Sequence, residues 1–244
     1  MTTPSLLILV PARGGSKRLP GKNLKYLGDR PLLAHTADAV AASGLQEPVV
    51  LSTDDAAIAE AGRRLGMLVP FVRPAALADD AAPTEAAVLH ALDWCVDMHG
   101  TDPDAVMVLQ PTSPFRGGGI LRAAVDALAE RADVDSIIGM TAIHLPADKI
   151  YFATRAGVAE PVSDAPRRPL YQPSGAVYLT RTSAFRRDKT LYAGTILPLV
   201  TDPLRALDID TQEDWRLAEA LLAAGLPPEQ HAFSADPSIT ESAP

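Results

Sequence analysis

Cationic side chains crowd the beginning of a chain whose net charge is −8. Residues 1–28 contain no Asp or Glu, and their basic residues are Arg13, Lys17, Arg18, Lys22 and Lys25. Arginine offers a planar fork of donors and lysine a point charge, so this group is suited to bind a polyphosphate. The alternative is a solvated basic turn between a strand and a helix, without a ligand.

Residues 11–23 have the composition of an anion-binding loop. Gly14 and Gly15 let the backbone approach an anion with its N–H groups exposed, and Ser16 adds a hydroxyl donor. The segment is not a P-loop, because five residues separate Gly15 from Gly21 where that motif has four. Its glycines also lack the spacing of the dinucleotide-binding fingerprint. The loop therefore matches neither of these two phosphate-binding motifs.

Two carboxylates near the other end of the chain are candidates for metal binding. Asp208 and Asp210 are two residues apart, so in an extended segment both would face the same side. Two carboxylates together with waters and substrate phosphates suit Mg²⁺. Thr211 followed three residues later by Asp214 also predicts a capping box at the start of a helix, where Asp210 would only favour the helix dipole. The residues alone leave both interpretations open.

Uncharged polar side chains follow a predicted buried strand at residues 105–109. Gln110, Thr112 and Ser113 alternate with prolines that stiffen the backbone, and neutral hydrogen-bonding groups suit sugar hydroxyls. An ordinary loop, with Ser and Pro in their usual turn roles, is the alternative. Arg73 could pair at the surface with an acidic residue of the segment 79–80.

Composition narrows the class of protein. The chain has 244 residues, 47% of them hydrophobic and 21% charged, and no apolar run long enough to span a membrane. The negative net charge argues against nucleic-acid binding. The single cysteine, Cys95, excludes a disulfide framework, and no secretion signal is visible, so we expect a cytoplasmic protein.

The elements that must position these residues alternate along the chain. Continuous aliphatic runs predict buried strands, helical spacing of apolar residues predicts helices between them, and the alternation predicts an α/β fold with a doubly wound, mostly parallel sheet. The expected strands are 6–10, 49–51, 105–109, 136–141, 175–179 and 196–200, and the expected helices are 32–42, 56–65, 84–99, 120–131 and 215–222.

The predicted organisation is a single domain over residues 1–225. Prolines recur and periodicity weakens over residues 144–173, which predicts an inserted arm instead of a second core. Residues 226–244 are polar and proline-rich, and we expect them to form a disordered tail.

Several separated motifs resemble the CMP-N-acylneuraminate synthetase family, the cytidylyltransferases that activate sialic acid and related nonulosonic acids. The resemblance spans about residues 6–222 of this sequence. The motifs, in chain order, are residues 11–23, Ser52-Thr53-Asp54, Arg73-Pro74 with Leu77-Ala78-Asp79, Leu109-Gln110-Pro111-Thr112-Ser113-Pro114, Ser174-Gly175-Ala176-Val177-Tyr178 and Asp208-Ile209-Asp210-Thr211.

This resemblance implies a Rossmann-like nucleotidyltransferase that joins CTP to a nonulosonic acid, giving a CMP-sugar and pyrophosphate with Mg²⁺ as cofactor. Arg13, Lys22 and Asp210 would be catalytic, and Asp208 and Asp210 would bind the metal. The implied nucleotide-binding residues are Ala12, Arg13, Gly14, Ser16, Lys17, Lys22, Asn23, Arg73 and Thr84, and the implied sugar-binding residues are Gln110, Thr112, Ser113 and Lys149.

The resemblance also implies a homodimer in which the arm at residues 144–173 exchanges between subunits and Lys149 reaches the partner's acceptor site. No histidine lies in a motif as a general base, and that role stays open. Two alternatives remain: a synthetase for CMP-3-deoxy-octulosonic acid, and a non-catalytic nucleotide-binding homologue. The pair Asp208 and Asp210 argues against the second, because a binding module needs no metal pair.

Overall fold

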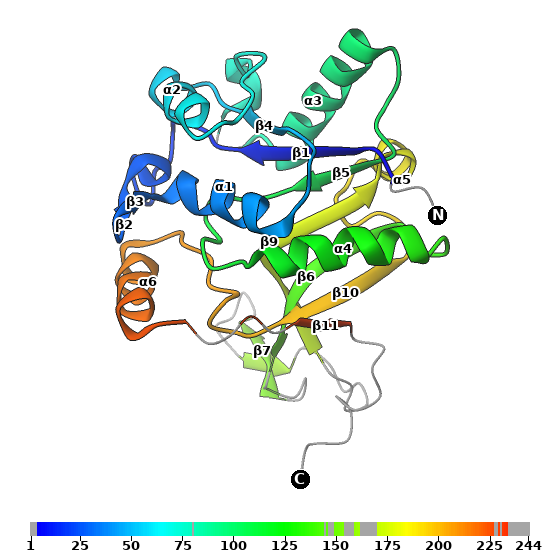
Figure 1. Ribbon diagram of the computed structural model, residues 1–244. Helices are drawn as coiled ribbons and strands as arrows, with labels where there is room; N and C mark the ends of the chain where they lie inside the picture. Colours follow the sequence, from blue (N-terminus) through cyan, green and yellow to red (C-terminus); the bar gives the residue numbers. More distant parts are fainter. Residues whose placement is uncertain are drawn as a thin grey trace.

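The computed structural model describes residues 4–79, 81–143, 145, 149–153, 159–161, 170–226, 229 and 231–233. Within this part, one large sheet contains seven strands (Figure 1). From edge to edge they are β11 (His231–Phe233), β10 (Ile196–Thr201), β6 (Ser136–Ile143), β9 (Leu170–Arg181), β5 (Ala105–Val108), β1 (Leu6–Pro11) and β4 (Val49–Ser52).

The strand directions confirm a mostly parallel sheet. β1 pairs in parallel with both β4 and β5, and β10 pairs in parallel with β6. β9 is antiparallel to both of its neighbours, β5 and β6, and β11 is antiparallel to β10. Leu170, the first residue of β9, pairs with Ile143, the last residue of β6. β9 therefore starts at the end of the sheet where β6 stops and runs in the opposite direction.

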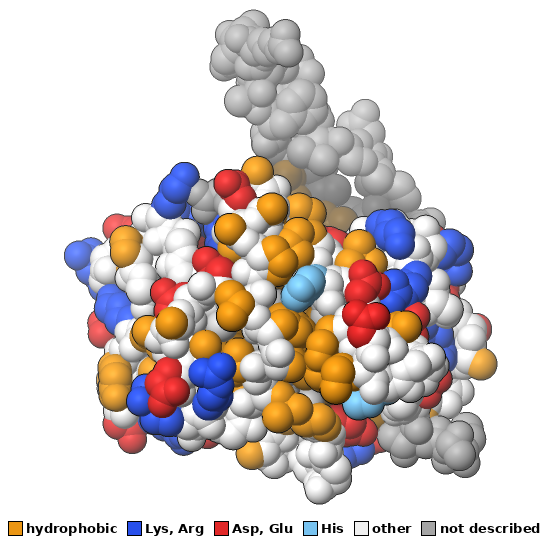
Figure 2. Space-filling model, turned by 90° about the horizontal axis from the view of Figure 1, so that it is seen from above, with side chains coloured by type: hydrophobic (Ala, Val, Ile, Leu, Met, Phe, Trp, Pro, Cys, Tyr) orange, Lys and Arg blue, Asp and Glu red, His pale blue; other side chains and the backbone are white. Residues whose placement is uncertain are grey.

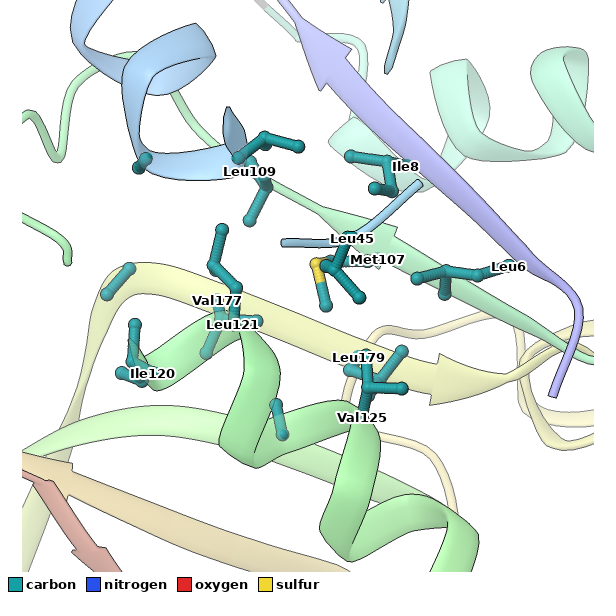
Figure 3. Packing of buried hydrophobic residues seen from close by; sticks show 14 of the residues in the cluster. Leu6, Ile8, Leu45, Met107, Leu109, Ile120, Leu121, Val125, Val177 and Leu179 are labelled. Atoms are coloured by element: carbon teal, nitrogen blue, oxygen red, sulfur yellow. The ribbon is translucent and has the colours of Figure 1, made fainter. Parts of the chain in front are cut away.

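Helices bury apolar residues against both faces of the sheet. They are α1 (Leu32–Ser43), α2 (Ala56–Arg64), α3 (Thr84–His99), α4 (Gly118–Glu130), α5 (Thr182–Asp188) and α6 (Gln212–Ala224). One core cluster joins the sheet to α1, α2 and α4, and Figure 3 shows its side chains from β1, β5, β9 and α4 meeting between the layers. A second cluster joins the other face to α3 and α5. Two covered faces explain why the central strands are continuously apolar.

A third, smaller cluster lies beside the main core. It packs Leu19 and Leu27, from the segment after β1, against Trp215 of α6 and the buried Ile209. The Lys25 ammonium group lies 4.0 Å from the centre of the Trp215 ring. This cluster therefore holds the basic loop and the acidic segment 208–210 against each other, although they are far apart in sequence.

One edge of the large sheet is covered by the chain itself. Leu68 forms a parallel bridge with Val50 of β4, and its N–H donates to the Val49 carbonyl oxygen at 2.8 Å.

Figure 2 looks onto the side that carries α2 and α3 and shows hydrophobic side chains in the middle of this face, with charged ones toward its margins. Leu68, Val72 and Met98 are exposed hydrophobic residues.

Most expected elements match the observed ones to within a few residues, while several short ones were not expected. These are α5, β11, the 3₁₀ helices η1 (Lys22–Leu24) and η2 (Ala75–Leu77), and two hairpins, β2 (Tyr26–Leu27) with β3 (Arg30–Pro31) and β7 (Tyr151–Ala153) with β8 (Ala159–Pro161). Residues 231–233, which lie within the expected tail, form β11 and pair with β10. Much of the expected arm lies outside the described residues. None of the described helices is long and apolar enough to cross a membrane.

Candidate active site

A cavity of about 570 Å³ lies at the carboxyl ends of β1 and β5, where open α/β sheets bind ligands. Both the basic loop and the acidic segment reach it. The predicted site residues that line it are Arg13, Ser16, Lys17, Lys22, Asn23, Arg73, Thr84, Gln110, Thr112, Asp208 and Asp210. Ala12, Gly14, Ser113 and Lys149 are not among its lining residues, although the sequence predicted a ligand contact for each.

Hydrogen bonds fix the first half of the basic loop. The Arg13 guanidinium donates to the Asp79 carbonyl oxygen at 2.8 Å, and the Asn23 amide donates to the Arg13 carbonyl oxygen at 3.1 Å. The Gly14 N–H donates to Asp54 Oδ1 at 3.0 Å, so this amide is engaged within the protein. A Cβ on Gly14 would lie 2.8 Å from Asp55 Oδ2, so close packing against the start of α2 requires glycine here.

The second half of the loop meets Asp210. Lys22 Nζ donates to Asp210 Oδ1 at 2.9 Å and to the Ile209 carbonyl oxygen at 3.1 Å. Arg18 Nη2 donates to Asp210 Oδ2 at 2.6 Å. Arg18 lines the cavity but was not among the predicted site residues. Its place in the acid-free segment was the signal that could have found it.

The acidic segment precedes α6 and also reaches the cavity. Thr211 and Asp214 form the predicted capping box at the start of α6. Asp208 and Asp210 nevertheless both line the cavity. Burial raises the pKa of the Asp208 carboxyl, against the opposing effect of a hydrogen bond from Thr112. Its Oδ1 atom is buried and has no hydrogen-bond partner in the structure, so this oxygen is available to a bound ligand.

The segment after β5 is held rigidly by buried hydrogen bonds. Ser113 Oγ donates to the Ser174 carbonyl oxygen at 3.1 Å, and Arg116 donates to the carbonyl oxygens of Gln110 and Ser113. Ser113 is fully buried, which explains why it does not line the cavity. The Ile209 N–H donates to the Thr112 carbonyl oxygen at 2.8 Å and thereby joins this segment to the acidic one.

Two further residues, Arg116 and Gly175, pack behind this side of the cavity without lining it. Burial lowers the pKa of Arg116, and the nearby Asp208 carboxylate partly offsets this effect. Gly175 of β9 has a φ of +70°, and a Cβ there would lie 2.5 Å from Ser113 Oγ and 3.2 Å from Gln110 Oε1. Sequence reasoning missed Arg116, because its partners are backbone carbonyls that only the fold brings within reach.

Arg73, Thr84 and Lys149 differ in their placement. Arg73 is buried and donates to Ser52 Oγ at 2.9 Å, so it anchors the end of β4 instead of pairing with a surface carboxylate; its burial lowers its pKa. Thr84 is the first residue of α3 and lines the cavity. Lys149 is exposed and does not line the cavity.

The arrangement offers three kinds of chemistry in one cavity. Its cations suit phosphates, its uncharged polar groups suit hydroxyls, and its carboxylates lie where both meet. The residues that the structure describes contain no group of three or more His, Cys, Asp or Glu that could hold a metal ion. Any cation at Asp208 and Asp210 would therefore take its remaining ligands from water and substrate, as Mg²⁺ commonly does.

Comparison with known proteins agrees with this chemistry. The profile of the cytidylyltransferase family matches residues 7–234. A CMP-N,N'-diacetyllegionaminic acid synthase of Legionella pneumophila is 33% identical over 228 residues, which cover 89% of this chain and 96% of that protein. A 3-deoxy-manno-octulosonate cytidylyltransferase of Methylococcus capsulatus is 36% identical over 178 residues, 72% of this chain and 63% of that protein.

Other matches are longer proteins or solved structures of low sequence identity. The chain spans 51% of the length of the N-acylneuraminate cytidylyltransferases that it matches from Streptococcus agalactiae and Escherichia coli. A solved structure of CMP:2-keto-3-deoxy-manno-octonic acid synthetase complexed with CTP shares the fold, with a TM-score of 0.66 at 18% identity over 90% of this chain and 99% of that one. On the profile match and the Legionella relative, this chain belongs to the cytidylyltransferase family.

Proposed function

We propose that this enzyme transfers CMP from CTP to the anomeric hydroxyl group of a nonulosonic acid. The hydroxyl oxygen forms a bond to the α-phosphorus, the bond to the β-phosphate oxygen breaks, pyrophosphate leaves and the hydroxyl proton is lost. The observation that carries this proposal is the single cavity in which cations of the loop 13–22 face the uncharged Gln110 and Thr112. Such a displacement depends mainly on positioning and charge stabilisation.

The basic loop would hold the triphosphate. Arg13 and Lys22 are the principal candidates, and Ser16 and Lys17 line the same wall. The Lys22 side chain is 14% exposed and its ammonium group is oriented by two acceptors, so its charge is fixed before substrate binds. A preorganised charge stabilises the negative charge that develops on the departing pyrophosphate without a cost of reorientation.

Asp208 and Asp210 fit the magnesium ion that the family resemblance implies. Asp208 contributes a buried oxygen without a partner, and Asp210 lies on the same wall of the cavity. When bound, the cation would neutralise phosphate charge and favour departure of pyrophosphate. The described residues that line the cavity include no histidine, so the hydroxyl proton leaves to a carboxylate or to water.

Gln110 and Thr112 would contact the acceptor sugar. The Legionella relative, of which 96% is covered, is named for a nonulosonic acid, and a pseudaminic acid cytidylyltransferase of Campylobacter jejuni is also similar. The second candidate, 3-deoxy-manno-octulosonate, is favoured by the Methylococcus relative, which matches a shorter part of the chain.

Lys149 would meet the sugar carboxylate in the partner subunit of a homodimer. It is exposed and does not line its own subunit's cavity, as expected of a residue that serves another active site. Mixing the inactive variants Lys149→Ala and Asp210→Ala would then restore activity in heterodimers, because one cavity would contain both native residues. If mixtures stay as inactive as the separate variants, the exchange of Lys149 is wrong.

The test of the proposed function is a panel of acids. Purified protein with CTP and Mg²⁺ should release pyrophosphate with at least one of legionaminic, pseudaminic or N-acetylneuraminic acid and form the CMP-sugar, measured by mass spectrometry. Turnover with 3-deoxy-manno-octulosonate alone would establish the second candidate. CTP binding without turnover on any acid would contradict both and favour a non-catalytic homologue.

A further inference from the structure

Asp210 is held by two cations. Each of its carboxylate oxygens has its own donor: Lys22 Nζ lies 2.9 Å from Oδ1 and Arg18 Nη2 lies 2.6 Å from Oδ2. Asp208 is different, because its Oδ1 atom is buried and has no partner. The two candidate metal ligands therefore differ: the Asp210 carboxylate is paired with two cations, whereas Asp208 Oδ1 has no partner.

The two cations differ in how easily they can leave Asp210. The Lys22 side chain is 14% exposed, and the Ile209 carbonyl oxygen holds it as well. The Arg18 side chain is 68% exposed, and a hydrogen bond to Asp210 holds its guanidinium group. An exposed ion pair contributes little to stability, so Arg18 can exchange partners at small cost.

Arg18 lies where a triphosphate would compete for it. It lines the cavity on the same loop as Arg13 and Lys17. Guanidinium groups bind phosphate oxygens through paired, charge-assisted hydrogen bonds, which are stronger than an exposed pair with a carboxylate. Asp214, which also experiences the Arg18 charge, is engaged by the capping box at Thr211 and offers Arg18 no comparable alternative.

We propose that Arg18 is a gate on Asp210. In the nucleotide-free enzyme it covers one oxygen of Asp210 and repels a divalent cation; when the nucleotide binds, Arg18 moves to the phosphates and leaves that oxygen to the metal. Nucleotide and cation then bind as a cooperative pair, because each favours the same position of Arg18. This role rests on the proposed function, since it assumes that a triphosphate occupies the cavity.

The gate predicts effects of opposite sign on the two ligands. Without nucleotide, Arg18→Met should bind Mn²⁺ about three- to tenfold more tightly than wild type, as removal of a neighbouring charge implies. Without metal, in EDTA, the same variant should bind CTP about three- to tenfold more weakly, because one charge-assisted phosphate contact is lost. A purely structural defect would weaken both.

The measurements are Mn²⁺ titration followed by electron paramagnetic resonance and CTP titration by calorimetry. Arg18→Lys keeps the charge and should retain the low Mn²⁺ affinity. Arg30→Met is the matched control, because it removes another surface arginine that is paired with an aspartate, Asp38. It should change neither the Mn²⁺ nor the CTP dissociation constant. In the double variant Arg18→Met with Asp210→Ala, the gain in Mn²⁺ affinity should vanish, which locates the ion at Asp210.

Two results would overturn the gate. Mn²⁺ affinity of nucleotide-free Arg18→Met that is unchanged or weaker would show that Arg18 does not guard Asp210. Unchanged CTP affinity in EDTA would show that Arg18 does not move to the phosphates. Failure of the proposed function has a different signature: wild-type protein would bind no CTP, or would bind it without releasing pyrophosphate with any acid, whereas the nucleotide-free Mn²⁺ titration would still report on the contact between Arg18 and Asp210.

Discussion

The two sides of the cavity are built in different ways. The proposed nucleotide side comes mainly from one continuous segment, residues 11–23, whose cationic side chains reach the cavity from a loop, and Arg73 and Thr84 line the cavity with it. The proposed acceptor side consists of Gln110 and Thr112 after β5 together with residues 208–210, and a buried hydrogen bond from Ser113 braces it against Ser174 of β9. The proposed nucleotide side supplies positive charge, which hydrogen bonds hold in place at Lys22, and the proposed acceptor side supplies a rigid surface of uncharged donors and acceptors beside two carboxylates.

Because the two sides differ, we expect substitutions on each side to change different kinetic and binding constants. The loop carries several cations, and each substitution of one removes a charge, so its variants should alter nucleotide affinity and turnover. The acceptor side depends on close approach, as at Gly175, where small displacements change the position of Gln110. Substitutions there should alter the KM for the acid first.

The largest effect is expected where the two sides meet. Asp210→Ala removes a candidate metal ligand and the shared partner of Arg18 and Lys22, and should lower kcat about 100- to 1,000-fold at saturating CTP. The fold should persist, because Asp210 contributes to no core cluster. Steady-state kinetics with a thermal-unfolding control measure both. A kcat within a few-fold of wild type would remove Asp210 from the catalytic machinery.

A smaller effect, confined to the acceptor side, is expected from Gly175→Ala. The added Cβ would lie 2.5 Å from Ser113 Oγ and displace Gln110, so the KM for the acid should rise about tenfold while CTP affinity is kept. Gly100→Ala is the matched control, because Gly100 has a φ of +76° and no atom within 4 Å of an added Cβ. Equal changes in both variants would attribute the effect to backbone strain alone.

Sequence reasoning succeeded where the chemistry lies in contiguous residues. The loop 11–23, the Gln110 motif and the pair Asp208 and Asp210 all reach one cavity, as expected from strands that end at one edge of the sheet. It failed where a role depends on distant partners. Ser113 bonds across to Ser174, Gly14 packs on Asp55 and Arg116 binds backbone carbonyls, none of which the spacing of residues reveals.

The fold shows the same limit. Buried strands and amphipathic helices follow from periodicity, but the antiparallel direction of β9 depends on the path of the segment before it. The short β11 has too little apolar sequence to be recognised, and its pairing with β10 arises from tertiary contact.

The smallest effect tests the corrected role of Ser113. Ser113→Ala removes a buried hydrogen bond to Ser174 and should lower the free energy of unfolding by about 1 kcal/mol. The KM for the acid should change less than about twofold, since the hydroxyl group does not line the cavity. Denaturant unfolding and steady-state kinetics give the two values. A large rise in KM with unchanged stability would return Ser113 to the sugar-binding residues.

The division of the cavity is tested most directly by one crossed measurement of two dissociation constants, for CTP and for the acid in the presence of an inert CTP analogue. Lys22→Met should weaken CTP binding about tenfold or more and leave acid binding almost unchanged. Gln110→Ala should weaken acid binding about three- to tenfold and leave CTP binding almost unchanged. If both variants weaken the same ligand, or if each weakens both equally, the cavity does not divide into a nucleotide side and an acceptor side.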